Sequence, residues 1–194
     1  LSGGDVTEGA MDEAIRHALT KMAHVHFVTN ESAERRVRQL GEDPANIHRV
    51  GNPALDGIAK LEPMERAAFE GALGMELREK NLLVTFHPET LNDQPSAMPF
   101  TELLGALDAL GPNVGLIFTK PNADTHGRVL VGMIDAFVQN HPNAVAQVSM
   151  GHRLYYTAMQ HADAVVGNSS SGLLEAPSFK IPTVNIGDRQ RGRE

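Results

Sequence analysis

Residues 81–86, NLLVTF, are the first of five short apolar runs that decide the fold class of this chain. The other four are VGLIFT (114–119), AVAQVS (144–149), AVVG (164–167) and PTVNI (182–186). Amphipathic segments such as FTELLGALDAL (100–110) and GRVLVGMIDAFVQ (127–139) lie between them. Short continuous apolar strands that alternate with helices are typical of a parallel sheet covered on both faces. The pattern therefore predicts a doubly wound α/β domain over residues 58–194.

The preceding residues, 1–57, are predicted to be the end of another α/β unit. Met11, Ile15, Leu19 and Met22 recur at helical spacing, which predicts a helix over about residues 8–23 with both methionines in the core. The segments that follow are predicted to be a strand (HVHFVT, 24–29), a helix capped by Asn30 (ESAERRVRQL, 31–40), a strand (IHRV, 47–50) and a connection between domains (GNPALDG, 51–57).

Composition excludes several classes of function. The chain has 194 residues, a formal net charge of −7 and no cysteine, which argues against a nucleic-acid groove and excludes thiolate chemistry and disulfides. No apolar run approaches the roughly 20 residues that a membrane span requires. We expect a cytoplasmic protein, and we expect the chain, which opens within LSGGD and ends at RQRGRE, to be part of a longer one.

Polar residues follow four of the predicted strands. They are HPET (87–90), KPNAD (120–124), MGH (150–152) and NSSSG (168–172). Ligands of open α/β sheets bind beyond the carboxyl ends of the strands. We therefore expect these four segments to face one crevice.

The serine cluster predicts a nucleotide site. A strand that runs through Ser169 and Ser170 into a helix aims hydroxyls, backbone N–H groups and a helix dipole at an anion, and Glu175 could accept from a sugar diol. Arg189 could pair with a phosphate, although Arg191 and Arg193 compete for that role. In the alternative interpretation the serines only cap a helix and the arginines are solvated. The chain has neither GxxxxGK[ST] nor GxGxxG.

Carboxylates near the start of the chain are candidates for acid and base catalysis. Asp5 follows a glycine pair, and Asp12 and Glu13 begin the predicted helix. Facing carboxylates can divide the two roles. Acidic residues in a first helical turn are also ordinary partners of the helix dipole, so both interpretations stay open.

Five segments of the chain together resemble the hydrolysing UDP-N-acetylglucosamine 2-epimerases, which feed sialic and legionaminic acid synthesis. The segments are SGGDVTEGAMDEAIRHALTKMAHVHFVTN (2–30), VGNPALD (50–56), FHPET (86–90), FTKPNAD (118–124) and GNSSSGLLEAPSFKIPTVNIGDRQRGRE (167–194). The resemblance implies a GT-B-like α/β fold with two Rossmann-like, doubly wound parallel-sheet domains. Residues 1–57 would be the end of the first domain with the hinge, and residues 58–194 most of the second.

The resemblance also implies roles for individual residues. Ser169 and Ser170 match diphosphate ligands, Glu175 the ribose ligand and Arg189 a phosphate arginine; His87 and Asn122 match nucleotide contacts, and Met150 a segment that meets the uracil. Asp5 and Asp12 match positions implicated in proton transfer, with Glu13 close by. Relatives often carry glutamate where this chain has Ser2, so the identity of the acid and the base stays open.

The implied reaction eliminates UDP through a glycal and hydrates the glycal to a free 2-epimerised sugar. No metal, nicotinamide or flavin is implied, the partner is a UDP-linked sugar, and a homodimer would fit the family. Three alternatives stay open: a non-hydrolysing epimerase, a GT-B glycosyltransferase and a non-catalytic nucleotide-sugar-binding module. The sugar, and UDP against GDP, also stay open.

Overall fold

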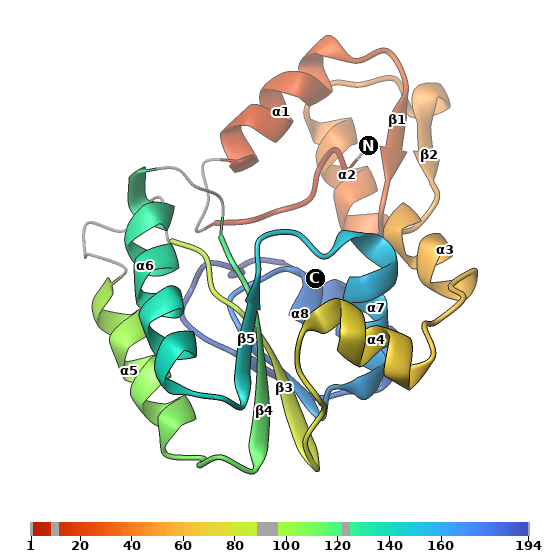
Figure 1. The fold of residues 1–194 in the computed structure, drawn as a ribbon. Helices are drawn as coiled ribbons and strands as arrows, with labels where there is room; N and C mark the ends of the chain where they lie inside the picture. The colour runs from red at the N-terminus through yellow and green to blue at the C-terminus, as the bar shows by residue number, and fades with distance from the viewer. Residues whose placement is uncertain (1, 9–11, 89–96, 122–124, 194) are drawn as a thin grey trace. The chain divides into compact units, whose positions relative to one another are not determined.

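The computed structural model describes residues 2–8, 12–88, 97–121 and 125–193, and these form two compact units (Figure 1). The first unit contains the described residues of 1–59 together with 188–193, and the second those of 60–88 and 97–187. The C-terminal residues thus group with the first unit, whereas the sequence assigned them to a domain of 58–194. The predicted boundaries of the whole protein's domains stay a prediction. Asn122 lies outside the described residues.

The second unit is built on the five predicted strands. They are β3 (Lys80–Thr85), β4 (Val114–Thr119), β5 (Ala144–Gln147), β6 (Ala164–Gly167) and β7 (Thr183–Asn185). Their order is β5-β4-β3-β6-β7 and every neighbouring pair is parallel, which confirms the doubly wound α/β class. Strands β4 and β5 are added on one side of β3, and β6 and β7 on the other, so the direction in which strands are added to the sheet reverses between β3 and β6. Such a reversal is the topological switch point of an open sheet.

Helices cover both faces of this sheet. Helices α5 (Ala97–Asp108) and α6 (Thr125–Asn140) lie on one face, and α4 (Arg66–Leu73) and α7 (Gly151–His161) on the other (Figure 1). After β6 come the short helix α8 (Ser171–Leu174) and the 3₁₀ turn η2 (Ala176–Phe179). This arrangement leaves the carboxyl edge of the strands to the loops.

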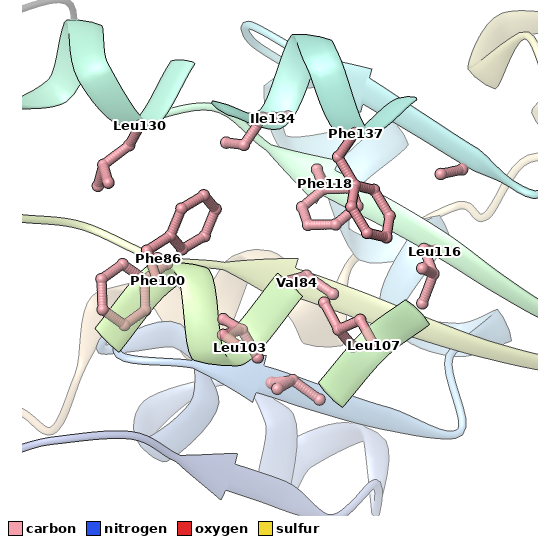
Figure 2. Packing of buried hydrophobic residues seen from close by; sticks show 12 residues of the cluster. Val84, Phe86, Phe100, Leu103, Leu107, Leu116, Phe118, Leu130, Ile134 and Phe137 are labelled. Atoms are coloured by element: carbon pink, nitrogen blue, oxygen red, sulfur yellow. The ribbon is translucent and has the colours of Figure 1, made fainter. Parts of the chain in front are cut away.

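Aromatic packing holds α5 and α6 onto β3 and β4 (Figure 2). The Phe86 and Phe100 rings lie 5.2 Å apart between centroids, and the Phe118 and Phe137 rings 5.6 Å. Side chains alternate along a strand, so Leu83 faces the other side of the sheet, where it is also fully buried. Burial of both faces explains why the central strands β3 and β4 are continuous apolar runs.

A histidine joins the ends of α5 and α6. One ring nitrogen of His141, Nδ1, lies 2.7 Å from the Phe137 carbonyl oxygen, and the other, Nε2, lies 2.9 Å from Asp108 Oδ1. The His141 ring also stacks on Phe137 at 3.8 Å. Asp108, followed by the Phe137 carbonyl, raises the pKa of His141 above its usual value.

The first unit has a small parallel sheet and short helices. In chain order its elements are α1 (Asp12–Met22), β1 (His26–Val28), α2 (Glu31–Gln39), η1 (Pro44–Asn46), β2 (Ile47–Arg49) and α3 (Pro53–Ala59). Val28, Ala33, Val37 and Ile47 form its buried cluster. The predicted cap is confirmed, since Asn30 Oδ1 accepts the Ala33 N–H at 2.8 Å. Across the described residues, no helix has the length and apolar character of a membrane span.

One sequence prediction for the first unit was wrong, and another segment has a form that the sequence did not indicate. The segment GNPALDG, predicted to be a connection between domains, holds most of α3, whose last residue, Ala59, precedes the first residue of the second unit. Asn52 accepts the Ala54 N–H and Pro53 opens the helix, so the Asn-Pro pair begins a helix here. Met22 is not in the core, because it is 75% exposed and the neighbouring apolar side chains of α1, Ile15 and Leu19, are exposed as well; Met11 lies outside the described residues.

Candidate functional site

The carboxyl ends of β3 and β6 meet at the switch point of the second unit. Thr85 pairs with Gly167, and the Asn168 N–H donates to the Thr85 carbonyl at 3.0 Å. Gly167 has a φ of +133°, and a Cβ at that position would lie 1.9 Å from the Thr85 carbonyl oxygen. Only glycine lets the two strands approach this closely.

Asn168 ties the loop after β3 to the loop after β6. Its Oδ1 accepts the His87 N–H at 2.7 Å, and its Nδ2 donates to the His87 carbonyl at 2.8 Å. The Asn168 side chain is fully buried. Two predicted site segments, at His87 and at the serines, are thereby held side by side at one edge of the sheet.

The three serines differ in what their hydroxyls contact. Ser169 Oγ accepts the Ser171 N–H at 3.3 Å, a local side-chain-to-backbone bond, whereas Ser170, the N-cap residue of α8, makes no side-chain cap bond. Ser171 is buried and its Oγ lies 2.7 Å from Tyr155 Oη. Ser169 and Ser170 remain partly exposed, and in the described part of the chain nothing hydrogen-bonds to the Ser170 hydroxyl. Ser169 and Ser170 are therefore the two serines of the cluster that a ligand could reach.

Glu175 lies where α8 meets η2, partly exposed. The Tyr156 hydroxyl donates to Glu175 Oε1 at 3.0 Å. Burial, followed by the bond to Glu175, raises the pKa of Tyr156 to about 12. Burial also raises the pKa of Tyr155, whose hydroxyl bonds to Thr85 as well as to Ser171. Helix α7 therefore holds the serine segment and Glu175 through two adjacent phenols.

Met150 is the N-cap residue that directly precedes helix α7. It has an αR backbone and a partly exposed side chain, and Gly151 after it has a φ of +61°. Met150 follows β5, and its helix carries the two tyrosines that contact the serine segment. Met150 therefore shares the carboxyl edge of the sheet with His87, Ser169 and Ser170.

In the first unit a tight loop holds Asp5. Gly4 has a φ of +79°, and a Cβ there would lie 2.2 Å from the Ala33 carbonyl oxygen, so the loop lies directly against α2. The Thr29 hydroxyl donates to Asp5 Oδ1 at 2.5 Å, and Arg16 Nη1 donates to the Asp5 carbonyl at 2.9 Å. The Asp5 carboxylate thus has a defined position.

The other two predicted acids have different surroundings. Glu13 Oε2 accepts the Thr7 N–H at 2.8 Å, which ties the loop to α1. Asp12 is exposed, and no hydrogen bond to its carboxylate is found within the described residues. Glu13 therefore has a structural contact that Asp12 lacks.

Arg193 connects the C-terminal residues 188–193 to the segment around Asp5 and Thr7 within the first unit. Arg193 Nη2 donates to Thr7 Oγ1 at 3.2 Å, and Arg16 Nη2 donates to the same oxygen at 3.4 Å. Burial lowers the pKa of Arg193, the charges of Arg16 and Arg189 lower it further, and the charges of Asp5 and Asp12 raise it. Arg189 and the two aspartates are therefore near enough to the Arg193 guanidinium to act on it electrostatically.

Sequence reasoning did not single out several positioning residues. Asn168 contacts His87, Tyr156 contacts Glu175 and Tyr155 contacts Ser171 beside the predicted serines. These contacts depend on chain segments that meet only in the folded protein. An adjacent pair of tyrosines on an amphipathic helix was the available signal. Among the described side chains, no three His, Asp or Glu residues gather as a metal site requires.

Comparison of the chain with known proteins finds relatives in one family. A family model described as UDP-N-acetylglucosamine 2-epimerase matches residues 1–194. The chain is 41% identical over 194 residues to a GDP/UDP-N,N'-diacetylbacillosamine 2-epimerase (hydrolyzing) of Campylobacter jejuni, and 33% identical to the UDP-N,N'-diacetylbacillosamine 2-epimerase (hydrolyzing) of Legionella pneumophila. Both matches cover 100% of this chain and 50% of the relative, so the chain spans about half the relatives' length.

Solved structures agree with the fold. The UDP-GlcNAc 2-epimerase from Neisseria meningitidis bound to UDP-GlcNAc matches with a TM-score of 0.77 at 16% identity, over 98% of this chain and 53% of that one. A putative UDP-N-acetylglucosamine 2-epimerase from Listeria monocytogenes matches with a TM-score of 0.73 at 19% identity, over 98% of this chain and 50% of that one. The predicted GT-B-like, Rossmann-like fold class is confirmed.

Proposed function

Because the chain belongs to the UDP-N-acetylglucosamine 2-epimerase family, we propose that the protein is a hydrolysing nucleotide-sugar 2-epimerase. It would convert UDP-N-acetylglucosamine, or a 2,4-diacetamido-6-deoxy relative, into UDP and the free sugar inverted at C2. The 41% identity to a hydrolysing epimerase over all 194 residues is the observation that carries the proposal, and it favours this branch over the non-hydrolysing one.

The second unit would bind the nucleotide. Ser169 and Ser170 would donate to the diphosphate and Glu175 would accept from the ribose, with His87 and Met150 as further nucleotide contacts. The position of His87, Ser169 and Ser170 directly after β3 and β6, at the switch point of a parallel sheet, supports the assignment, since that is where such sheets bind ligands. Asn122 belongs to the same proposal and lies outside the described residues.

The first unit would supply the proton transfers and a cation. A carboxylate would remove the proton from C2 while the bond from C1 to oxygen breaks, so that the electron pair leaves on UDP and a C1–C2 double bond forms. Water would then give its hydroxyl to C1 while C2 takes a proton on the opposite face. Arg189 would stabilise the departing diphosphate, the step at which charge develops.

Of the three acids, Asp5 and Asp12 are the better candidates for proton transfer. Glu13 uses one carboxylate oxygen to hold the Thr7 N–H, whereas Asp12 is exposed and Asp5 is held in place by Thr29 and Arg16. A general acid or base has to reach the substrate, so a carboxylate engaged by the main chain is less suited to the role.

Incubation of the full-length protein with UDP-N-acetylglucosamine in D₂O, followed by NMR, tests the proposal. We expect UDP together with free N-acetylmannosamine that carries deuterium at C2. Interconversion of nucleotide sugars without UDP release would instead indicate the non-hydrolysing branch, and binding of UDP without any product a binding module. UDP release that depends on an acceptor would indicate a glycosyltransferase. UDP-N,N'-diacetylbacillosamine and its GDP analogue as parallel substrates would identify the sugar and the nucleotide. A homodimer and a cytoplasmic location stay predictions.

A further inference from the structure

We propose that Tyr156 is a positioning residue that orients the Glu175 carboxylate toward the ribose hydroxyls, and that it thereby sets the preference of the site for a ribonucleotide. The inference rests on the proposed function, in which Glu175 binds ribose. The contact that carries it lies within the second unit, where the Tyr156 hydroxyl donates to Glu175 Oε1 at 3.0 Å.

The Glu175 carboxylate needs such a partner. The last side-chain torsion of glutamate has broad, weakly preferred minima, so the carboxylate plane is not defined by the backbone. Recognition of a sugar hydroxyl requires an oxygen in a defined direction. Tyr156 occupies Oε1, and within the described residues Oε2 accepts no hydrogen bond from the protein. The second oxygen, Oε2, is therefore the one available to a ligand.

Tyr156 is itself held rigidly. Its side chain is 5% exposed, and its ring lies 5.8 Å from Phe179 and 5.9 Å from His152 between centroids. A phenol is protonated at neutral pH, and the pKa of Tyr156, raised to about 12, extends its role as a donor to the carboxylate well above that pH. A hydrogen bond to a charged acceptor is stronger than one between neutral groups. Packing fixes the ring, and the ring fixes the direction of the bond.

Tyr155 offers a matched control on the same helix. Its hydroxyl lies 2.7 Å from Ser171 Oγ and also bonds to Thr85, but it has no bond to Glu175. Tyr155→Phe and Tyr156→Phe each remove one oxygen and keep a ring. If the two variants differ in ribose preference, the difference reports the contact with Glu175.

The experiment measures dissociation constants by calorimetry for UDP and for 2′,3′-dideoxyuridine diphosphate, which lacks both ribose hydroxyls. The wild-type protein should prefer UDP. Tyr156→Phe should weaken UDP binding by about tenfold, the loss expected for one hydrogen bond to a charged group, and leave the dideoxy analogue unchanged. Tyr155→Phe should keep the wild-type ratio of the two constants. In a Glu175→Ala background, Tyr156→Phe should have no further effect.

Two outcomes would overturn the role of Tyr156 while leaving the proposed function intact. In the first, the wild type prefers UDP and Tyr156→Phe keeps that preference. In the second, Tyr156→Phe weakens both ligands by the same factor, as general damage to the fold would. Two other results are failure of the wild-type protein to bind UDP and equal binding of UDP and the dideoxy analogue. Either result would contradict the assignment of Glu175 to the ribose, and the role of Tyr156 would be refuted with it.

Discussion

Replacement of Gly167 by alanine should open the sheet at the candidate site. The position combines a φ of +133° with a Cβ that would lie 1.9 Å from the Thr85 carbonyl oxygen and 2.7 Å from its carbon. A non-glycine residue in a disfavoured backbone conformation costs about 1–3 kcal/mol, and overpacking costs about as much again. Together they reduce the free energy of unfolding by about 2–6 kcal/mol, a large part of the about 5–15 kcal/mol that stabilises a typical domain.

Urea unfolding followed by circular dichroism measures this loss, and Gly132→Ala is the matched control. Gly132 lies in α6 and is exposed, and no neighbouring atom lies within 4 Å of the point that an alanine Cβ would occupy, so alanine should stabilise the helix by about 0.5–1 kcal/mol. The same substitution should therefore have opposite signs at the two sites. A loss below about 1 kcal/mol at Gly167 would refute the close approach of β6 to β3.

Three further predictions concern charged residues. Asp108 raises the pKa of His141 above 6.5 in the folded protein, so the stabilisation from this pair is complete below that pH and is lost as the pH rises through the folded pKa. Urea unfolding should therefore show a lower free energy of unfolding at about pH 8 than at about pH 6, and Asp108→Asn should reduce this difference. Arg189→Ala should reduce UDP release by about 100-fold or more in a coupled assay, and an unchanged rate would exclude Arg189 as the phosphate ligand. Asp5→Asn and Asp12→Asn should abolish deuterium incorporation at C2 and keep UDP affinity, whereas deuterated product from both would move the base elsewhere.

The fold class could be predicted because its physical cause is local. Each of the five apolar runs overlaps a strand, and for the central strands β3 and β4 the reason is that a strand buried on both faces needs consecutive apolar residues. The same pattern indicated that the candidate residues His87, Ser169 and Ser170 follow strand ends, and the structure places them there. The exposed face of α1 could not be predicted, because spacing identifies the apolar face of a helix without telling whether other segments cover it, and the described residues leave Met22 uncovered.

The contacts around the candidate residues could not be predicted from the sequence either. Ser171 looked like part of the anion site, yet its hydroxyl is turned to Tyr155, and Glu175 is held by a tyrosine from a different helix. Arg193 was only a competitor for the role of Arg189, but it shares Thr7 with Arg16. These outcomes depend on distances between segments far apart in sequence, which a single sequence does not contain.

The two hydrogen bonds between His87 and Asn168 affect when this edge of the sheet can form during synthesis. The two residues are 81 positions apart, and β3 has to wait for β6 before its second edge is paired. A ribosome adds about 5–20 residues per second, so for several seconds a nascent chain would carry β3 with that edge unprotected. Long-range parallel pairing of this kind is slow and prone to aggregation, so the arrival of β6 protects the exposed edge of β3.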